Sequence, residues 1–276
     1  MYWKRQGGTE YLVKCSPKNA QRSLGPRSQE TTLIYEAFTK RKEVARRRLA
    51  DLTKELARHQ RMNRALHVGR APKLLVDILH RLYKSGLAEH FTVVGTHALY
   101  AYETAAGVRV GHAALATRDI DLLWDTRKRI TFVSQMETLG LSMLGFIRKV
   151  DPTFEIREDQ RYTAVNSKGF EVDIIRREVI DGDPHPLRLT DTEDEFFAVQ
   201  AKRAGVLLSA PRFSSMIVST SGHMARMNTV SPVAFANFKR WMAERPDRAP
   251  LKRQRDILQA TLVDKLVEDY LPHLLT

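Results

Sequence analysis

Short apolar runs of strand length recur in the middle of the chain, separated by segments with the spacing of helices. Residues 91–94, 119–124, 161–165 and 170–175 have the length and apolar content of strands. Residues 96–105 and 132–144 have helical spacing, and Asn166-Ser167-Lys168-Gly169 separates the last two strands as a hairpin turn. This order predicts a small mixed sheet with helices on one face.

The N-terminal part has a different pattern. Residues 3–16 predict a short hairpin around Gly7-Gly8, residues 23–28 a loop, and residues 40–66 a long helix without Gly or Pro. The long helix carries apolar and polar positions at alternating spacings of four and three, which form a heptad-like seam: Ala45, Leu49, Leu52, Leu56, His59, Asn63 and Leu66. Because the lower half of the seam is polar, we expect it to pack on the body of the protein rather than form a long homodimeric coiled coil. Residues 74–87 predict a further amphipathic helix.

The C-terminal part is predicted to be mainly helical. Residues 192–208 are expected to form a helix whose acidic first turn complements the macrodipole, and residues 233–244 and 256–271 two more helices. Residues 213–218 and 223–228 predict a hairpin across Thr220-Ser221-Gly222. The chain is therefore predicted to be an α+β protein with three parts: a basic N-terminal hairpin and helical arm (1–88), a core with the mixed sheet (89–190), and a mainly helical C-terminal domain (191–276).

Composition places few limits beyond those of an ordinary globular chain. The 276 residues are 43% hydrophobic, which is enough for one large or two moderate cores. The sequence has no run of eighteen apolar residues and no signal-peptide core at its N-terminus, so we expect a soluble, cytoplasmic protein without a membrane partner. The single cysteine, Cys15, excludes an internal disulfide framework and a Cys-based zinc site, and we expect it to be a small packing residue.

Charge is distributed very unevenly. The net charge is +13, and residues 1–90 contribute +12 of it, with 20 Lys/Arg and 8 Asp/Glu. A one-sided basic segment of this kind is typical of a nucleic-acid contact. The alternatives are a solvated helix face and a contact with an acidic partner protein.

The most informative candidate chemistry is a set of three aspartates on two predicted strands. Asp119 and Asp121 are two residues apart on one strand, so they project to the same face, and Asp173 interrupts the apolar run of a second strand. Three converging carboxylates repel one another unless a cation lies between them, and hard oxygen ligands suit Mg²⁺. Such a site, completed by phosphates, is the basis of two-metal phosphoryl transfer. The upstream turn at Gly95-Thr96 could supply backbone N–H groups to those phosphates.

A second Asp-x-Asp, Asp181-Gly182-Asp183, lies among Gly and Pro with no strand pattern and is expected to be a turn. For the first pair, the alternative is a strand end with solvated acids beside Arg118 and Arg127. The Gly-Thr turn upstream and Asp173 downstream favour the metal site.

The motifs resemble a known superfamily. Val93-Val94-Gly95-Thr96, then Arg118-Asp119-Ile120-Asp121, then Val172-Asp173-Ile174 are similar to the pattern of the DNA polymerase β-like nucleotidyltransferases. Residues 93–103 and 116–123 more narrowly resemble a bacterial nucleotidyltransferase-fold family. The resemblance implies the polymerase β-like nucleotidyltransferase fold, with Asp119, Asp121 and Asp173 as catalytic residues and metal ligands. It also implies nucleotide contacts by Gly95 and Thr96 and, from the helices that follow the sheet, by Lys239, Lys252 and Arg255.

The predicted function is metal-dependent transfer of an NMP from an NTP, ATP included, to a hydroxyl acceptor, with release of pyrophosphate. Two Mg²⁺ ions are expected, with Mn²⁺ able to replace them. The basic N-terminal arm favours tRNA or another RNA as acceptor; a protein hydroxyl, a small molecule and a protein partner such as an antitoxin stay open. The principal alternative is a non-catalytic nucleic-acid or partner-binding protein that keeps the fold. A third hypothesis is a DNA-bound accessory protein in which the acids are structural.

Overall fold

The computed structural model describes residues 1–16, 19–180 and 185–275 of the chain. Contacts within the chain define two compact units, Met1–Arg61 and Met62–Thr276. Strands from the predicted core and from the predicted C-terminal domain pair within one sheet of the second unit, and the three-part division by sequence stays a prediction. No helix among the described residues is long and apolar enough to cross a membrane.

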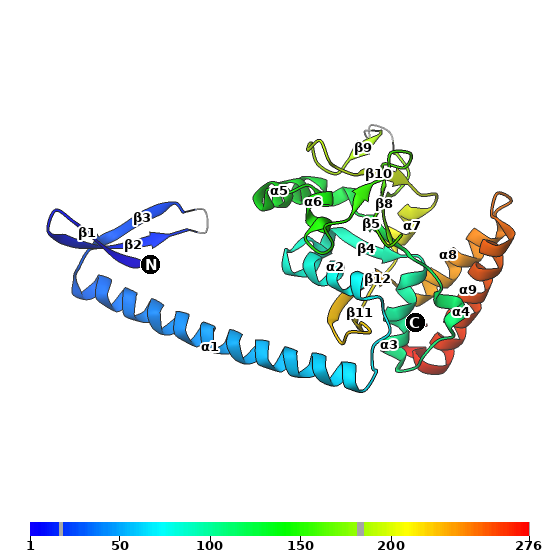
Figure 1. Cartoon of the computed structure of the whole chain (residues 1–276), viewed down its shortest axis with the longest axis horizontal. Helices are drawn as coiled ribbons and strands as arrows, with labels where there is room; N and C mark the ends of the chain where they lie inside the picture. Colours follow the sequence, from blue (N-terminus) through cyan, green and yellow to red (C-terminus); the bar gives the residue numbers. More distant parts are fainter. Residues whose placement is uncertain (17–18, 181–184, 276) are drawn as a thin grey trace. The chain divides into compact units, whose positions relative to one another are not determined.

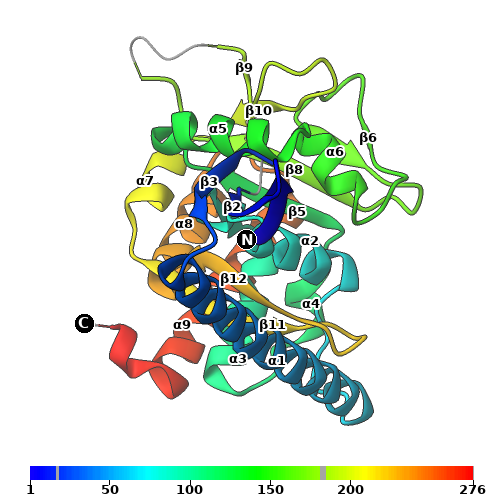
Figure 2. The same cartoon turned by 90° about the vertical axis from the view of Figure 1, so that its left-hand side faces the viewer.

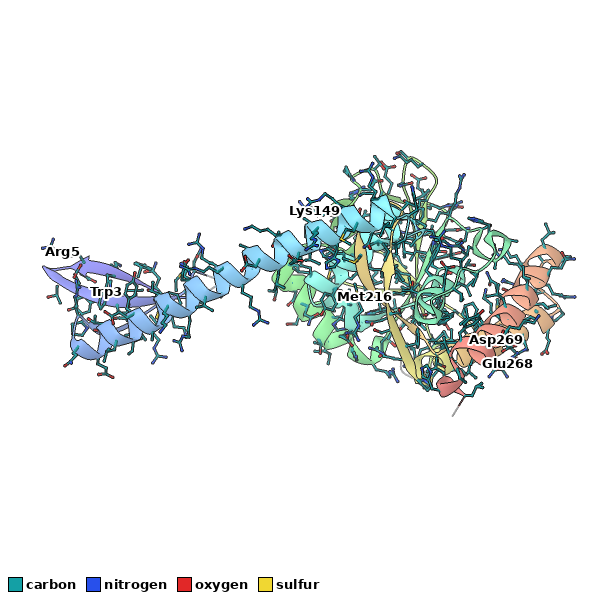
Figure 3. The ribbon with its side chains drawn as sticks, turned by 90° about the horizontal axis from the view of Figure 1, so that it is seen from below. Trp3, Arg5, Lys149, Met216, Glu268 and Asp269 are labelled. Carbon is teal, nitrogen blue, oxygen red and sulfur yellow. The ribbon has the colours of Figure 1, made fainter. Side chains whose placement is uncertain are left out.

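The first unit is an antiparallel three-stranded sheet followed by a long helix. Figure 2 shows both near the label of the N-terminus. Its elements are β1 (Tyr2–Gln6), β2 (Thr9–Cys15), β3 (Gln21–Pro26) and α1 (Gln29–Ala65). The predicted hairpin of β1 and β2 is confirmed, with Gly7 and Gly8 at φ 56° and 82° in the turn. Trp3 on β1, labelled in Figure 3, packs on Tyr35 of α1 with ring centroids 5.6 Å apart.

Two sequence-based expectations for this unit are wrong. Residues 23–28 were expected to form a loop, but most of them belong to β3, which pairs antiparallel with β2. Most residues of β3 are exposed, so its sequence does not alternate between apolar and polar positions. Only its pairing with β2 identifies it as a strand. Cys15 is exposed rather than packed. On α1, the seam residues Leu49, Leu52 and Leu56 are 67%, 53% and 57% exposed.

The second unit is built on a mixed sheet, whose central strands are visible in Figure 1. Within the described residues, its strands run in the order β11-β12-β4-β5-β8-β10-β9, with β7 beside β8 and β6 beside β7. Their bounds are β4 (Phe91–Val94), β5 (Asp119–Trp124), β6 (Glu155–Ile156), β7 (Thr163–Val165), β8 (Glu171–Arg176), β9 (Leu187–Arg188), β10 (Phe197–Gln200), β11 (Arg212–Val218) and β12 (Met224–Val230).

The central strands of the sheet include both parallel and antiparallel neighbours. β4 and β5 are antiparallel, whereas β5 and β8 are parallel and β12 is parallel to β4. All four residues of β4 are buried, and β5 and β8 alternate between buried residues and half-buried acids over their first four positions. The first residues of β5 and β8 therefore form one polar region on otherwise apolar, buried strands. A functional site can lie at such a region of a core sheet.

Two helices pack on strands of this sheet, α2 on β12 and α3 on β11, and α8 packs along α9. In Figure 3, Glu268 and Asp269 mark the last turns of α9 and Met216 marks β11. The helical bounds are α2 (Lys73–Lys84), η1 (Leu87–His90), η2 (Thr96–Ala98), α3 (Leu99–Ala106), α4 (His112–Leu115), η3 (Thr126–Lys128), α5 (Arg129–Leu139), α6 (Met143–Arg148), α7 (Ala204–Ser209), α8 (Pro232–Glu244), α9 (Pro250–Tyr270) and η4 (Pro272–Leu274).

The sequence was right about the hairpins, about α8 and about the helical segment expected over 96–105, but wrong about the bounds of several other helices. The helix expected over 132–144 is two helices, because Gly140 ends α5 at φ 63° and the Ser142 hydroxyl caps α6 by accepting from Gly145 N. The last helix begins at Pro250, a favourable first-turn residue, rather than at 256.

The helix expected over 192–208 is the largest error, since this segment contains strand β10 and only the short helix α7. Glu195 explains it. Its carboxylate is fully buried and accepts from Met143 N at 3.1 Å, Phe196 N at 2.9 Å and the Thr190 hydroxyl at 2.6 Å. The acidic residue does satisfy the N-terminus of a helix, but that helix is α6, whose first residue lies 52 positions earlier in the chain.

We therefore expect Glu195→Ala to lower the free energy of unfolding by about 2–4 kcal/mol, because three buried donors lose their acceptor. Urea denaturation followed by circular dichroism measures this. The matched control is Glu193→Ala two residues away, where an exposed carboxylate is removed and a change within about 0.5 kcal/mol is expected. Equal effects of the two substitutions would contradict the capping role.

Candidate active site

The three predicted aspartates come together through the pairing of β5 with β8. Asp119 and Asp121 are the first and third residues of β5, and Asp173 is the third residue of β8. The register places Asp121 directly opposite Asp173 and Asp119 opposite Glu171. All three aspartates line one cavity of about 580 Å³. The sequence pattern therefore located the residues that meet, and the parallel register explains why they meet.

Gly95 directly follows β4 and places the backbone against the carboxylate of Asp121. Its φ is +70°, and a Cβ atom placed on it would lie 2.1 Å from Asp121 Oδ2. No side chain fits at this distance, so the position requires glycine for both conformation and space. Gly95 and Thr96 line the same cavity as the aspartates.

Asp121 has the least favourable environment of the three carboxylates. Burial, followed by the charges of Asp119 and Asp173, raises its pKa to about 7, against the opposing effect of Lys239 and Arg255. Burial also raises the pKa of Asp173, whose Oδ1 accepts a hydrogen bond from Thr163 Oγ1 at 2.5 Å. The cluster has more negative charge than its surroundings stabilise, which is the electrostatic condition that a bound cation relieves.

The donor set fits a divalent metal. The three aspartates offer only hard oxygen ligands, the type that Mg²⁺ prefers, and no Cys or His of the described residues lines the cavity. Among the described residues, no three His, Cys, Asp or Glu side chains are already close enough to form a preformed metal cluster. Metal binding by Asp119, Asp121 and Asp173 is therefore a prediction from chemistry and placement.

Basic side chains from α8, α9 and the loops before them complete the cavity. Lys239, Lys252 and Arg255, which the resemblance selected, all line it. Lys239 is 6% exposed and its Nζ donates to Asp256 Oδ1 at 2.8 Å. Burial lowers its pKa, against the raising effect of Asp256. Arg255 donates to the carbonyl of Ala116 at 3.1 Å, and Lys252 is exposed.

Sequence reasoning missed several residues of this site. Lys202, Arg245 and Arg248 also line the cavity, and Arg248 Nε donates to Asp256 Oδ2 at 2.7 Å. Asp256 is fully buried and accepts from both Lys239 and Arg248, so it connects α8 to the start of α9. A signal was present in the sequence, because Asp256 falls on the same helical face as the buried Ala260 and Val263.

His97 is a buried, neutral residue that supports the first residue of β5. It is 1% exposed, and its Nδ1 donates to the carbonyl of Asp119 at 2.9 Å. Burial lowers its pKa to about 4, so the ring is neutral at neutral pH. His97 therefore fixes the position of the strand end that carries Asp119.

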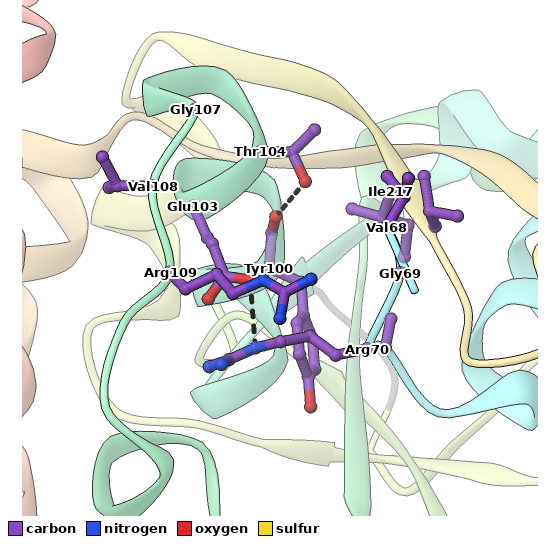
Figure 4. A pocket seen from close by; sticks show the side chains of 12 residues that line it. Val68, Gly69, Arg70, Tyr100, Glu103, Thr104, Gly107, Val108, Arg109 and Ile217 are labelled. Atoms are coloured by element: carbon purple, nitrogen blue, oxygen red, sulfur yellow. Dashed lines mark hydrogen bonds and ion pairs between the residues drawn. The ribbon is translucent and has the colours of Figure 1, made fainter. Parts of the chain in front are cut away.

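A second cavity of about 210 Å³ lies between the segment Val68–Ala71, α3 and β11 (Figure 4). Its charged groups pair within the protein: Arg70 Nε lies 3.0 Å from Glu103 Oε1 as an ion pair, and Glu103 Oε2 accepts from Val110 N at 3.0 Å. Arg109 donates to the carbonyl of His67. These contacts are those of a structural ion pair rather than of a site.

The Asp181-Gly182-Asp183 turn predicted from the sequence lies outside the described residues.

Comparison with known proteins agrees with this arrangement. A nucleotidyltransferase family model (NTP_transf_8) matches residues 73–276, and the chain belongs to this family. It is therefore an enzyme of the class that transfers nucleoside monophosphates, and this finding favours catalysis over the non-catalytic alternatives. No curated protein matches the sequence. The solution structure of the antibiotic-resistance factor ANT(2″)-Ia is similar at 15% identity with a TM-score of 0.28, over 71% of this chain and 88% of that chain.

We expect Asp121→Asn to stabilise the metal-free protein at pH 8 by about 1–2 kcal/mol, after allowing for solvent screening. The folded-state pKa of Asp121, about 7, lies above the unfolded value of 3.8, so the ionised carboxylate costs stability. The cost is absent below the unfolded pKa and complete above the folded one. The gain from Asn should therefore shrink as the pH falls from 7 to 4.

Urea denaturation in the presence of a chelator, repeated between pH 4 and pH 8, measures this difference. Asp191→Asn, which changes an exposed aspartate in the same way, is the control and should be neutral at every pH. A loss of stability in Asp121→Asn at pH 8 would show that the carboxylates are not in mutual repulsion.

Proposed function

We propose that this protein transfers an NMP from an NTP to a hydroxyl of an RNA acceptor, with Mg²⁺ as the metal. The observation that carries the proposal is the composition of one cavity. The three aspartates of β5 and β8, a glycine turn without room for a side chain and six Lys/Arg residues line the same volume of about 580 Å³, together with Asp247. Carboxylates hold cations and the cations hold phosphates, which is the combination that a nucleoside triphosphate with its metal requires.

Asp119, Asp121 and Asp173 would hold two Mg²⁺ ions, for which Mn²⁺ can substitute. When bound, these ions neutralise phosphate charge and favour deprotonation of the acceptor hydroxyl. Asp173 is the residue best suited to stand beside the acceptor, because Thr163 already occupies its Oδ1 and leaves Oδ2 for another partner. Its raised pKa is consistent with a carboxylate that can take a proton.

The remaining residues bind and orient the triphosphate. Gly95 and Thr96 offer backbone N–H groups and a hydroxyl next to the carboxylates, and Lys239, Lys252 and Arg255 offer positive charge. Lys239 is held by Asp256, so it is positioned before the substrate arrives. The apolar side chains of Leu207, Phe238 and Met242 line the same cavity and give a nucleobase a dry wall.

The acceptor is assigned from the charge of the N-terminal region. Arginines follow one another along α1 and are exposed: Arg46, Arg47, Arg48, Arg58 and Arg61. Of these, Arg47 pairs with Glu43 at 3.0 Å. A helix with this much exposed positive charge fits the phosphate backbone of RNA.

Activity is tested by incubating the protein with each radiolabelled NTP, Mg²⁺ and total cellular RNA. We expect label in RNA, and a loss of at least about a thousandfold in Asp119→Ala, Asp121→Ala and Asp173→Asn, because each removes a proposed ligand of the metal. Asp191→Ala is the matched control and should keep full activity. Label in protein rather than RNA would redirect the acceptor, and near-normal transfer by either Asp119 or Asp121 variant would overturn the metal assignment.

The arm is tested separately by replacing its five exposed arginines, Arg46, Arg47, Arg48, Arg58 and Arg61, with Gln. We expect RNA affinity to fall and the log–log salt dependence to flatten by up to about 3.5, since each phosphate contact with a single strand contributes roughly 0.7. The affinity for NTP should not change. Unchanged RNA binding measured by fluorescence anisotropy would mean that the charge of α1 serves a solvated surface or a protein contact.

A further inference from the structure

Gln259 is a fully buried polar residue behind the phosphate turn, and the proposed reaction does not yet use it. It lies on α9, more than 160 residues after Thr96. Its Nε2 is 3.1 Å from Thr96 Oγ1 and 2.7 Å from the carbonyl oxygen of Ala114 in α4. One amide group therefore joins three segments that are far apart in the sequence.

The chemistry of these partners fixes the direction of both hydrogen bonds. The carbonyl of Ala114 can only accept, so the amide nitrogen of Gln259, and not its oxygen, must face it. The second hydrogen of the same nitrogen then points to Thr96 Oγ1, which becomes an acceptor. Among the described residues, the Gln259 amide oxygen has no hydrogen-bond partner.

Because the Thr96 hydroxyl accepts from Gln259, its own proton can be donated to another acceptor. Thr96 is 5% exposed and lines the same cavity as Asp119 and Asp121. Within the described part of the chain, Gln259 is the only residue in hydrogen bond with its hydroxyl. A hydroxyl that accepts from a fixed amide keeps its own proton for another acceptor, and a phosphate oxygen bound at the Gly95-Thr96 turn would be such an acceptor.

We infer that Gln259 is a positioning residue that holds Thr96 as a hydrogen-bond donor to a phosphate oxygen of the NTP. The inference rests on the proposed function, because it needs a nucleotide phosphate at the Gly95-Thr96 turn. It goes beyond it by assigning a direction to the Thr96 hydroxyl and a role to a residue on α9. It also explains why a polar side chain is retained among buried apolar residues of this helix: Ala260, Val263 and Leu266.

The test is a double-mutant cycle between Gln259→Met and Thr96→Val, read as KM for NTP and as equilibrium binding of a non-hydrolysable NTP with Mg²⁺. Each single variant should raise KM about tenfold or more, the size expected for a lost hydrogen bond to a charged oxygen, and change kcat less than about threefold. The double variant should be within about twofold of Thr96→Val alone, because Gln259 acts only through that hydroxyl. In a Thr96→Ser background, which keeps the hydroxyl, Gln259→Met should again raise KM about tenfold.

Gln259→Glu separates hydrogen-bond direction from packing, and it keeps the test intact where Gln259→Met fails to fold. Glutamate has nearly the same shape, but a carboxylate accepts where the amide donates, so KM should rise at least as much as with Met. Gln254→Met makes the same chemical change at an exposed position of α9 and should leave KM unchanged.

The outcomes are distinguishable. A wild-type protein that neither binds NTP nor transfers it would overturn the proposed function and this inference together. Normal binding and transfer with multiplicative effects of Thr96→Val and Gln259→Met would overturn only the inference. A Gln259→Glu variant with wild-type KM would do the same, because it would show that Gln259 fills space rather than directing a hydrogen bond.

Discussion

The repulsion among three carboxylates on neighbouring parallel strands is the constraint on which the rest of this site depends. Asp121 and Asp173 lie opposite one another in the β5–β8 register, and Asp119 lies on the same face of β5. Such a cluster is costly in the absence of compensating charge. Lys239 on α8 and Arg255 on α9 offset part of that cost at Asp121.

The compensating charge is itself held in place by a buried acid. Lys239 faces the aspartates from α8, and Asp256 on α9 accepts hydrogen bonds from both Lys239 and Arg248. An isolated buried lysine would lose its proton, and an isolated buried aspartate would gain one. The pair keeps both charges inside the protein, so the positive side of the cavity is set by packing between two helices rather than by flexible surface residues.

Backbone geometry connects the two sides of the site. Gly95 comes so close to Asp121 that any side chain would collide with the carboxylate, and His97 holds the carbonyl of Asp119 from the next turn. Gln259 reaches the same turn from α9. The Gly95-Thr96 turn is thus packed between β5, which carries two of the acids, and α9, which carries Lys252 and Arg255, and each element limits the movement of the others.

The sequence by itself determined the central strands, the three hairpins, α8 and the three aspartates, because alternation and apolar runs are local properties that the sheet preserves. The resemblance to nucleotidyltransferases also selected Lys239, Lys252 and Arg255, which the structure places around the same cavity as Gly95. Tertiary structure alone decided the rest. The segment around Glu195 reads as a helix start but caps α6 instead, and β3 exists only through its pairing with β2. Asp256 and Gln259 acquire their roles from partners 17 and 163 residues away, and no local pattern specifies contacts across such distances.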